Sequence, residues 1–202
     1  MRLVRPSAHE LEALFGPATR SIWICSPWIT TDGARLLGSA LSRCTLNRLV
    51  AVEIWMRIEE EERAAGFNDY VAVDALLRRL DVEAPSARVT LWSASQLHAK
   101  VIWTDQGALI GSANLTGAGF GSNVELAARL EPSECAAQLS IRELLRVDMT
   151  EVSRPSWAAF MGEPPSGNQP PAQPQAGLAS ESQWESFHER LLADLRRGGI
   201  RG

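Results

Sequence analysis

The chain has 202 residues, of which 45% are hydrophobic and 22% charged, and its formal net charge is −4. This composition excludes a disordered chain, which would be less apolar and more highly charged, and a length of this order favours one main domain with a real core. Non-specific nucleic-acid binders are usually basic. A polyanionic ligand would therefore have to be bound by a local patch of this acidic chain.

The sequence carries no sign of export or of membrane insertion. The first ten residues contain no apolar core and reach the carboxylate of Glu10, which argues against a signal peptide. No apolar run approaches the roughly 20 residues of a membrane-spanning helix. We therefore expect a cytoplasmic protein with no membrane partner. The three cysteines, Cys25, Cys44 and Cys135, are odd in number and widely spaced, which predicts buried thiols rather than disulfides or a zinc site.

Short apolar and β-branched runs of strand length recur along the chain. They predict strands at residues 21–25, 48–55, 88–92, 98–104, 108–111 and 124–130. Helical spacing of apolar residues predicts helices between several of these strands. Three of the helices have a candidate N-cap, and a fourth is opened by a proline; these residues are Ser7, Asp32, Asp69 and Pro132, the last helix running to about Arg146. The acidic run 59–62 predicts a solvated loop or helix face rather than a partner site.

The order of these elements predicts an α/β fold. Strands separated first by helices and then by a hairpin turn at 105–107 indicate a mixed parallel and antiparallel sheet flanked by helices. We expect the sheet within residues 18–147 and the domain that contains it at 1–160.

The composition changes after this domain. Residues 163–177 contain five of the eleven prolines, which predicts a Pro-rich linker over 161–180. An apolar stripe that includes Trp184 and Leu191 then predicts an amphipathic helix at 181–198. A helix this short needs a packing partner. The partner can be the chain's own sheet, a second subunit or another protein, and the sequence leaves these alternatives open.

Four polar residues suit the chemistry of a phosphodiester. His98 and Lys100 are two residues apart, so on a strand an imidazole and an ammonium group would point to the same side. Ser112 and Asn114 follow the next predicted strand with a hydroxyl and an amide. Lys100, Ser112 and Asn114 could hold the non-bridging oxygens of a diester, while a neutral ring nitrogen of His98 attacks phosphorus.

A carboxylate and an amide follow at Glu125 and Asn123. Glu125 is the candidate acceptor that would hold the other ring nitrogen of His98 protonated and stabilise the imidazolium. Asn123 could orient the site or close the loop. The sequence contains no cluster of carboxylates or histidines that would build a Mg²⁺ or Zn²⁺ site, so we expect neither a metal nor another cofactor.

Together these residues resemble the motifs of the phospholipase D superfamily. The pattern His-x-Lys-x4-Asp at 98–105 is followed by Gly-Ser-x-Asn at 111–114 and by Glu125, and Ser26 lies in a segment similar to the family's substrate rim. The resemblance covers about residues 18–147. It implies that His98 forms a covalent phosphohistidine and that Lys100 and Asn114 bind phosphate. Asp105 lies at the predicted hairpin turn, where we expect it to cap backbone N–H groups.

The motif is present in one copy, whereas the reaction needs a second histidine to protonate the leaving oxygen. The resemblance therefore implies a twofold homodimer in which His98 of each subunit faces one phosphate. Short members with one motif resemble bacterial nucleases of restriction and anti-phage defence systems. The sequence thus predicts a metal-independent nuclease, with DNA ahead of RNA. The alternatives are a phospholipase D-type lipid or small-diester hydrolase and a non-catalytic nucleic-acid-binding or assembly subunit of a defence complex, docked through helix 181–198.

Overall fold

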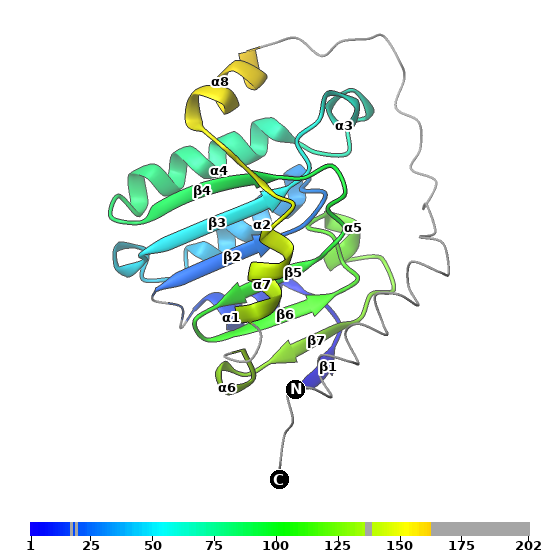
Figure 1. Cartoon of the computed structure of the whole chain (residues 1–202). Helices are drawn as coiled ribbons and strands as arrows, with labels where there is room; N and C mark the ends of the chain where they lie inside the picture. Colours follow the sequence, from blue (N-terminus) through cyan, green and yellow to red (C-terminus); the bar gives the residue numbers. More distant parts are fainter. Residues whose placement is uncertain (17, 19, 136–138, 163–202) are drawn as a thin grey trace. The chain divides into compact units, whose positions relative to one another are not determined.

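A computed structural model describes residues 1–16, 18, 20–135 and 139–162, all of which belong to one compact unit. Its centre is an eight-stranded sheet with the order β1-β7-β6-β5-β2-β3-β4-β8 (Figure 1). The strands are β1 (Arg2–Val4), β2 (Ser21–Cys25), β3 (Ala51–Met56), β4 (Arg88–Ser93), β5 (Val101–Thr104), β6 (Gly107–Gly111), β7 (Ala127–Leu130) and β8 (Thr150–Val152). Strands β2, β3 and β4 are parallel and the other pairs antiparallel, which confirms the predicted mixed sheet.

Helices flank both faces of this sheet. The α-helices are α1 (Ala8–Phe15), α2 (Thr31–Leu41), α3 (Glu60–Ala65), α4 (Tyr70–Glu83), α5 (Gly117–Phe120), α6 (Pro132–Cys135), α7 (Leu139–Arg146) and α8 (Arg154–Gly162), and a 3₁₀ turn covers Leu46–Arg48. Figure 1 shows α1, α2 and α4 behind the sheet and α7 in front of it. None of the helices in the described ranges is long and apolar enough to span a membrane.

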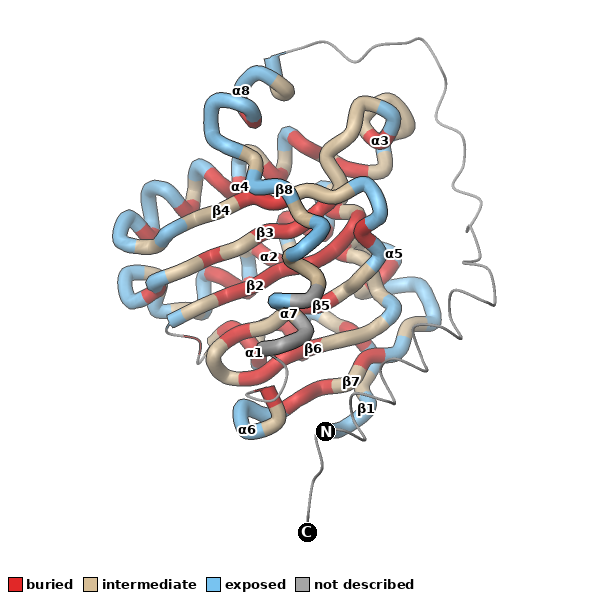
Figure 2. The backbone as a smooth tube through the Cα atoms, in the orientation of Figure 1, coloured by how far each residue is buried: buried red, intermediate tan, exposed pale blue. Residues whose placement is uncertain are grey.

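Alternation of side chains along the strands separates two cores. In β2, Ile22 and Ile24 join the larger core with α1, α2 and α4, whereas Trp23 and Cys25 point to the opposite face. That second face is rich in tryptophan: the ring of Trp23 lies 4.9 Å from that of Trp55 in β3. The central strands are buried on both faces, as Figure 2 shows by their colour.

The helix starts depend on side-chain caps. The side chain of Ser7 accepts a hydrogen bond from the Glu10 backbone, and that of Asp69 from the Ala72 backbone, as predicted. The prediction for α2 was wrong by two residues. Thr30 is its cap, and Asp32 lies in the first turn, where a carboxylate still favours the positive end of the helix.

The predicted range of the sheet was wrong, because strands β1 and β8 lie outside residues 18–147. Within the helix predicted from Pro132 to Arg146, the structure describes α6 and α7, and residues 136–138 between them lie outside the described residues. The predicted helix 181–198 and all of the predicted linker after residue 162 lie outside the described residues.

A close backbone contact joins the segment after β2 to the segment after β6. Ile29 forms a β-bridge with Leu115, and the Thr30 backbone donates a hydrogen bond of 3.1 Å to the Leu115 carbonyl. At Gly33 in α2 there is no room for a side chain, because a Cβ atom would lie 1.8 Å from that carbonyl oxygen. The glycine therefore lets α2 approach the loop that holds Asn114.

Replacing Gly33 with alanine is expected to lower the free energy of unfolding by about 3 kcal/mol, because the new methyl group must push helix and loop apart. Urea denaturation measures the change. Gly38→Ala in the same helix is the control. Its nearest contact would be the flexible end of Arg79 at 3.3 Å, and we expect a change within about 1 kcal/mol. Equal stabilities of the two variants would contradict the close contact.

Candidate active site

The predicted site residues lie around one edge of the sheet. Cys25 at the end of β2 pairs with Val101 at the start of β5, and Gly111 at the end of β6 pairs with Ala127 at the start of β7. Along this edge, β2 and β6 end where their antiparallel neighbours β5 and β7 begin. The segments that carry His98, Ser112, Glu125 and Ser26 all leave or enter the sheet there, although they are up to 99 residues apart (125 − 26).

His98 and Lys100 lie just before β5, which begins at Val101 and is thus shorter than predicted. The Lys100 carbonyl still accepts a hydrogen bond of 3.2 Å from the Gly111 backbone, so the pairing with β6 continues one residue beyond the strand. Lys100 is half-buried and its Nζ donates a hydrogen bond of 2.6 Å to the His98 carbonyl. His98 itself is exposed at the surface.

Ser112 organises the entry to β7. Its backbone N–H donates to the Leu126 carbonyl at 3.1 Å, and its Oγ accepts from the Leu126 backbone at 3.2 Å and donates to Glu125 Oε2. Asn123 Nδ2 donates to the other carboxylate oxygen of Glu125 at 3.3 Å. The strand predicted at 124–130, which includes Glu125, is shorter than predicted. The Ser112 side chain takes the place of a strand partner, and β7 begins only at Ala127.

Glu125 is thus held by Ser112 and Asn123. The role of the carboxylate as the hydrogen-bond acceptor for the His98 ring stays a prediction.

Ser26 connects two of the converging segments. It is buried, its Oγ donates to the Trp28 carbonyl at 2.7 Å, and the same oxygen accepts from the Leu115 backbone at 3.0 Å. Asn114 lies next to Leu115, and its buried Oδ1 has no hydrogen-bond partner among the described residues.

Asp105 lies at the opposite end of β5, in the turn to β6. Its Oδ1 accepts hydrogen bonds from the backbones of Arg20 at 3.0 Å and Ser21 at 3.3 Å, and its Oδ2 accepts from the Gln106 side chain. The carboxylate therefore ties the hairpin to the start of β2. Of the predicted site residues, Asp105 is the one that the fold keeps away from this edge.

The surroundings of His98 favour a neutral imidazole. Although the residue is exposed, partial desolvation of its ring, followed by the charges of Lys100 and Arg57, lowers the pKa of His98 below its ordinary value. Burial also lowers the pKa of Lys100 to about 8; Arg57 acts in the same direction, and Glu125 opposes it. Cys25 itself stays a thiol, because burial raises its pKa to about 12.

Two charged residues of this region were not predicted from the sequence, because they lie outside the family motif. Arg57 follows β3 and Glu62 lies in α3, and they form an ion pair at 3.0 Å in which Glu62 is 8% exposed. The prediction that the acidic run 59–62 is solvated was wrong for Glu62. Residues 59–62 are four consecutive glutamates, and the sequence does not indicate which of them is buried. The contact with Arg57 identifies Glu62 as the buried one.

Comparison with known protein families identifies the family of the chain. A model of the family described as "Cardiolipin synthase, PLD-like domain" matches residues 11–142. The chain belongs to the phospholipase D superfamily. The match covers the sheet from β2 to β7 and every predicted site residue. No curated protein matches the chain.

Solved structures with a similar fold include three from bacteria. Nuc of Salmonella typhimurium, a phospholipase D family member, has 18% identity and a TM-score of 0.48, and the match covers 71% of this chain and 88% of Nuc. NucT of Helicobacter pylori has 19% identity and a TM-score of 0.49, with 70% and 88% covered. Phosphatidylserine synthase of Haemophilus influenzae Rd KW20 has 18% identity and a TM-score of 0.49, with 75% and 40% covered.

The edge offers little enclosed space. A cavity with a volume of about 10 Å³ lies between Lys100, Ser26 and Ala113, which is room for one water molecule. Within the described ranges, no group of three or more His, Cys, Asp and Glu side chains is arranged to hold a metal ion. The groups gathered at the edge are therefore an imidazole, an ammonium group, a hydroxyl, an amide and a carboxylate.

Proposed function

We propose that the chain is a metal-independent phosphodiesterase, and specifically a nuclease with DNA as its favoured substrate. The observation that carries this proposal is the convergence of His98, Lys100, Ser112 and Asn114 at one edge of the sheet. Membership of the phospholipase D superfamily supports the reaction class. A place in a restriction or anti-phage system stays a prediction from the sequence.

The first step forms a bond between phosphorus and His98. A ring nitrogen of the neutral imidazole attacks, the bond from phosphorus to the leaving oxygen breaks, and that oxygen takes a proton from a general acid. Negative charge grows on the non-bridging oxygens. Lys100 stabilises this charge through its ammonium group, and Ser112 and Asn114 through hydrogen bonds.

The second step releases the phosphate. Water attacks phosphorus, gives its proton to the group that acted as the acid, and the bond to His98 breaks. One copy of the motif supplies the nucleophile but no acid. We propose that the acid is His98 of a second copy in a twofold homodimer, so that two imidazoles face one phosphate.

The surface beside Glu125 supports such a dimer. The neighbouring side chains Val124 and Leu126 are large and apolar, yet they are 103% and 57% exposed. Burying them against a symmetry-related copy would remove apolar surface from water next to the site and bring a second His98 toward the first.

The shape of the edge supports a polymeric substrate. The cavity beside Lys100 has room for about one water molecule, which favours a diester that lies across the open edge, as the backbone of a nucleic-acid strand can, over one that enters a deep pocket. The family description, which names cardiolipin synthase, favours a second candidate substrate, a lipid or small diester of the phospholipase D type. Lipid vesicles therefore belong among the substrates to be assayed.

Cleavage by the purified protein is expected to persist in excess EDTA, because His98 and Lys100 supply the nucleophile and the positive charge that a metal would otherwise provide. The assay follows strand breaks in single- and double-stranded DNA, with RNA and phosphatidylcholine vesicles as parallel substrates. Turnover of the vesicles alone would replace the nuclease proposal with the lipid alternative. Loss of cleavage in EDTA that returns with Mg²⁺ would contradict the metal-independent mechanism.

The pH dependence of kcat/KM is expected to be bell-shaped. Activity falls as the pH drops through the lowered pKa of His98, because an imidazolium is no nucleophile. It falls as the pH rises because the second His98 loses the proton that the leaving oxygen takes, and it falls further near pH 8, where Lys100 loses its charge. Lys100→Arg keeps the charge at high pH and is expected to remove the part of the fall near pH 8. An alkaline limb that stays near pH 8 in this variant would assign it to another group.

A further inference from the structure

The segment that carries His98 is held by side chains rather than by strand pairing. Three consecutive carbonyl oxygens accept hydrogen bonds: that of Leu97 from Arg57 Nε at 2.9 Å, that of His98 from Lys100 Nζ at 2.6 Å, and that of Ala99 from the Cys25 thiol at 3.5 Å. The three donors come from three different strands or the segments next to them. The position of the imidazole therefore depends on these anchors.

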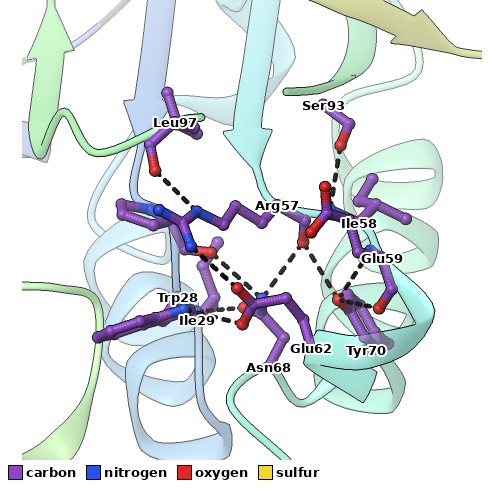
Figure 3. Close-up of polar contacts among 11 residues, drawn as sticks. Trp28, Ile29, Arg57, Ile58, Glu59, Glu62, Asn68, Tyr70, Ser93 and Leu97 are labelled. Atoms are coloured by element: carbon purple, nitrogen blue, oxygen red, sulfur yellow. Dashed lines mark hydrogen bonds and ion pairs between the residues drawn. The ribbon is translucent and has the colours of Figure 1, made fainter. Parts of the chain in front are cut away.

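Arg57 is the anchor that the family motif does not contain. Its guanidinium donates to Leu97 through Nε and to Glu62 Oε1 through Nη1 at 3.0 Å, so its plane is fixed by two partners (Figure 3). Its side chain is 22% exposed and that of Glu62 is 8% exposed. A buried ion pair costs desolvation energy on both sides, and a hydrophobic pair would fill the same space at less cost.

The other oxygen of Glu62 extends the network to the loop after β2. Oε2 accepts a hydrogen bond from Trp28 Nε1 at 3.0 Å, and the Trp28 ring stacks on Phe67 at 5.3 Å. One carboxylate thus joins the loop after β2 to the guanidinium that holds the His98 segment. Figure 3 shows the carboxylate of Glu62 joined by dashed lines to both Trp28 and Arg57.

The backbone of Arg57 is fixed as well. Its carbonyl oxygen accepts hydrogen bonds from Asn68 Nδ2 and from the Tyr70 hydroxyl, both at 3.2 Å, and its N–H donates to the Pro27 carbonyl at 3.3 Å. Asn68 and Tyr70 are both buried. The guanidinium is therefore attached to a rigid base, as a group that positions another one must be.

We propose that Arg57 is a positioning residue for His98, which orients the nucleophile through the Leu97 carbonyl and is itself oriented by Glu62. This inference rests on the proposed function, because it assigns His98 as the nucleophile. The charge of Arg57 adds to the effect. Together with Lys100, it favours the neutral imidazole that must attack phosphorus.

Two substitutions separate orientation from charge. Arg57→Lys keeps the charge but cannot make both hydrogen bonds in one plane, and we expect kcat to fall about 10- to 100-fold with KM nearly unchanged. Arg57→Gln removes the charge too, and we expect the same fall in kcat and a rise in the pKa of His98, measured by NMR titration. Glu62→Gln is expected to lower kcat in the same direction.

The control is Arg63→Gln. Arg63 in α3 also pairs with a glutamate, Glu60, and also donates to a backbone carbonyl, but that carbonyl belongs to Phe160, in α8. We expect no change in kcat or in the pKa of His98. An unchanged kcat in Arg57→Lys would overturn the proposal, and so would a rise in KM alone, which would make Arg57 a substrate-binding group.

A third readout needs no activity. Hydrogen–deuterium exchange of the segment 94–100 is expected to be faster in Arg57→Lys than in the wild type and unchanged in Arg63→Gln. If the wild type cleaves no diester, the proposed function fails while exchange and titration still test the anchor. If the wild type cleaves but neither kcat nor exchange responds to Arg57→Lys, the anchor fails alone.

Discussion

Replacing His98 with alanine is expected to abolish cleavage, with a loss of at least about 10⁴-fold in kcat, because the bond to phosphorus can no longer form on the enzyme. The fold is expected to survive. His98 is exposed, and the hydrogen bond that anchors it to Lys100 uses its backbone carbonyl, which alanine keeps. Strand breaks in EDTA measure the activity, and thermal unfolding measures the stability.

His9→Ala is the matched control, because His9 is exposed in α1 and belongs to no site segment. Brief incubation with end-labelled DNA followed by a denaturing gel adds a direct readout. We expect label attached to the protein for the wild type and for His9→Ala but not for His98→Ala. Residual cleavage within tenfold of the wild type in His98→Ala would show that another group is the nucleophile.

The central strands of this fold could be predicted from the sequence because burial on both faces produces continuous apolar runs. The run from Ser21 to Cys25 has the bounds of β2. The edge strands could not. β1 and β8 have three residues each and are mostly exposed, so they carry neither alternation nor an apolar run. They form because β7 and β4 offer unpaired backbone groups, which is information from elsewhere in the chain.

The candidate site divides in the same way. The motif predicts the order of His98, Lys100 and Asn114 along the edge, since each position is fixed by the spacing between a strand and its loop. It did not predict where the strand after Glu125 begins, because that boundary depends on a hydrogen bond between the Ser112 side chain and the Leu126 backbone. A hydrogen bond of this kind produces no periodic pattern in the sequence from which the end of a strand could be predicted.

Arg57 and Glu62 show why positioning residues are harder to find. Each lies in a polar segment whose sequence is typical of a solvated loop or helix, and neither belongs to the spacing that carries the motif. Their burial results from the meeting of the loops after β2 and β3, which are parallel neighbours in the sheet and end at the same edge. The contact between these loops follows from the strand order of the sheet, which the local sequence around Arg57 and Glu62 does not contain.

A shared active site is expected to make inactive subunits dominant over active ones. If each reaction needs His98 from both copies, then random pairing of one part wild type with nine parts His98→Ala leaves about one dimer in a hundred with both imidazoles, and activity should fall to about 1%. Subunits that act independently would retain about 10%, in proportion to the wild-type chains present.

Co-expression at graded ratios, with the two chains carrying different tags, measures this dependence. His9→Ala in place of His98→Ala is the control and is expected to leave activity unchanged at every ratio. A square-law fall in activity requires the second imidazole at the first one's phosphate, because a dimer with two separate sites gives a linear fall. A linear fall, or an active species that sedimentation identifies as a monomer, would leave the nucleophile in place but assign the general acid to a group within the same chain.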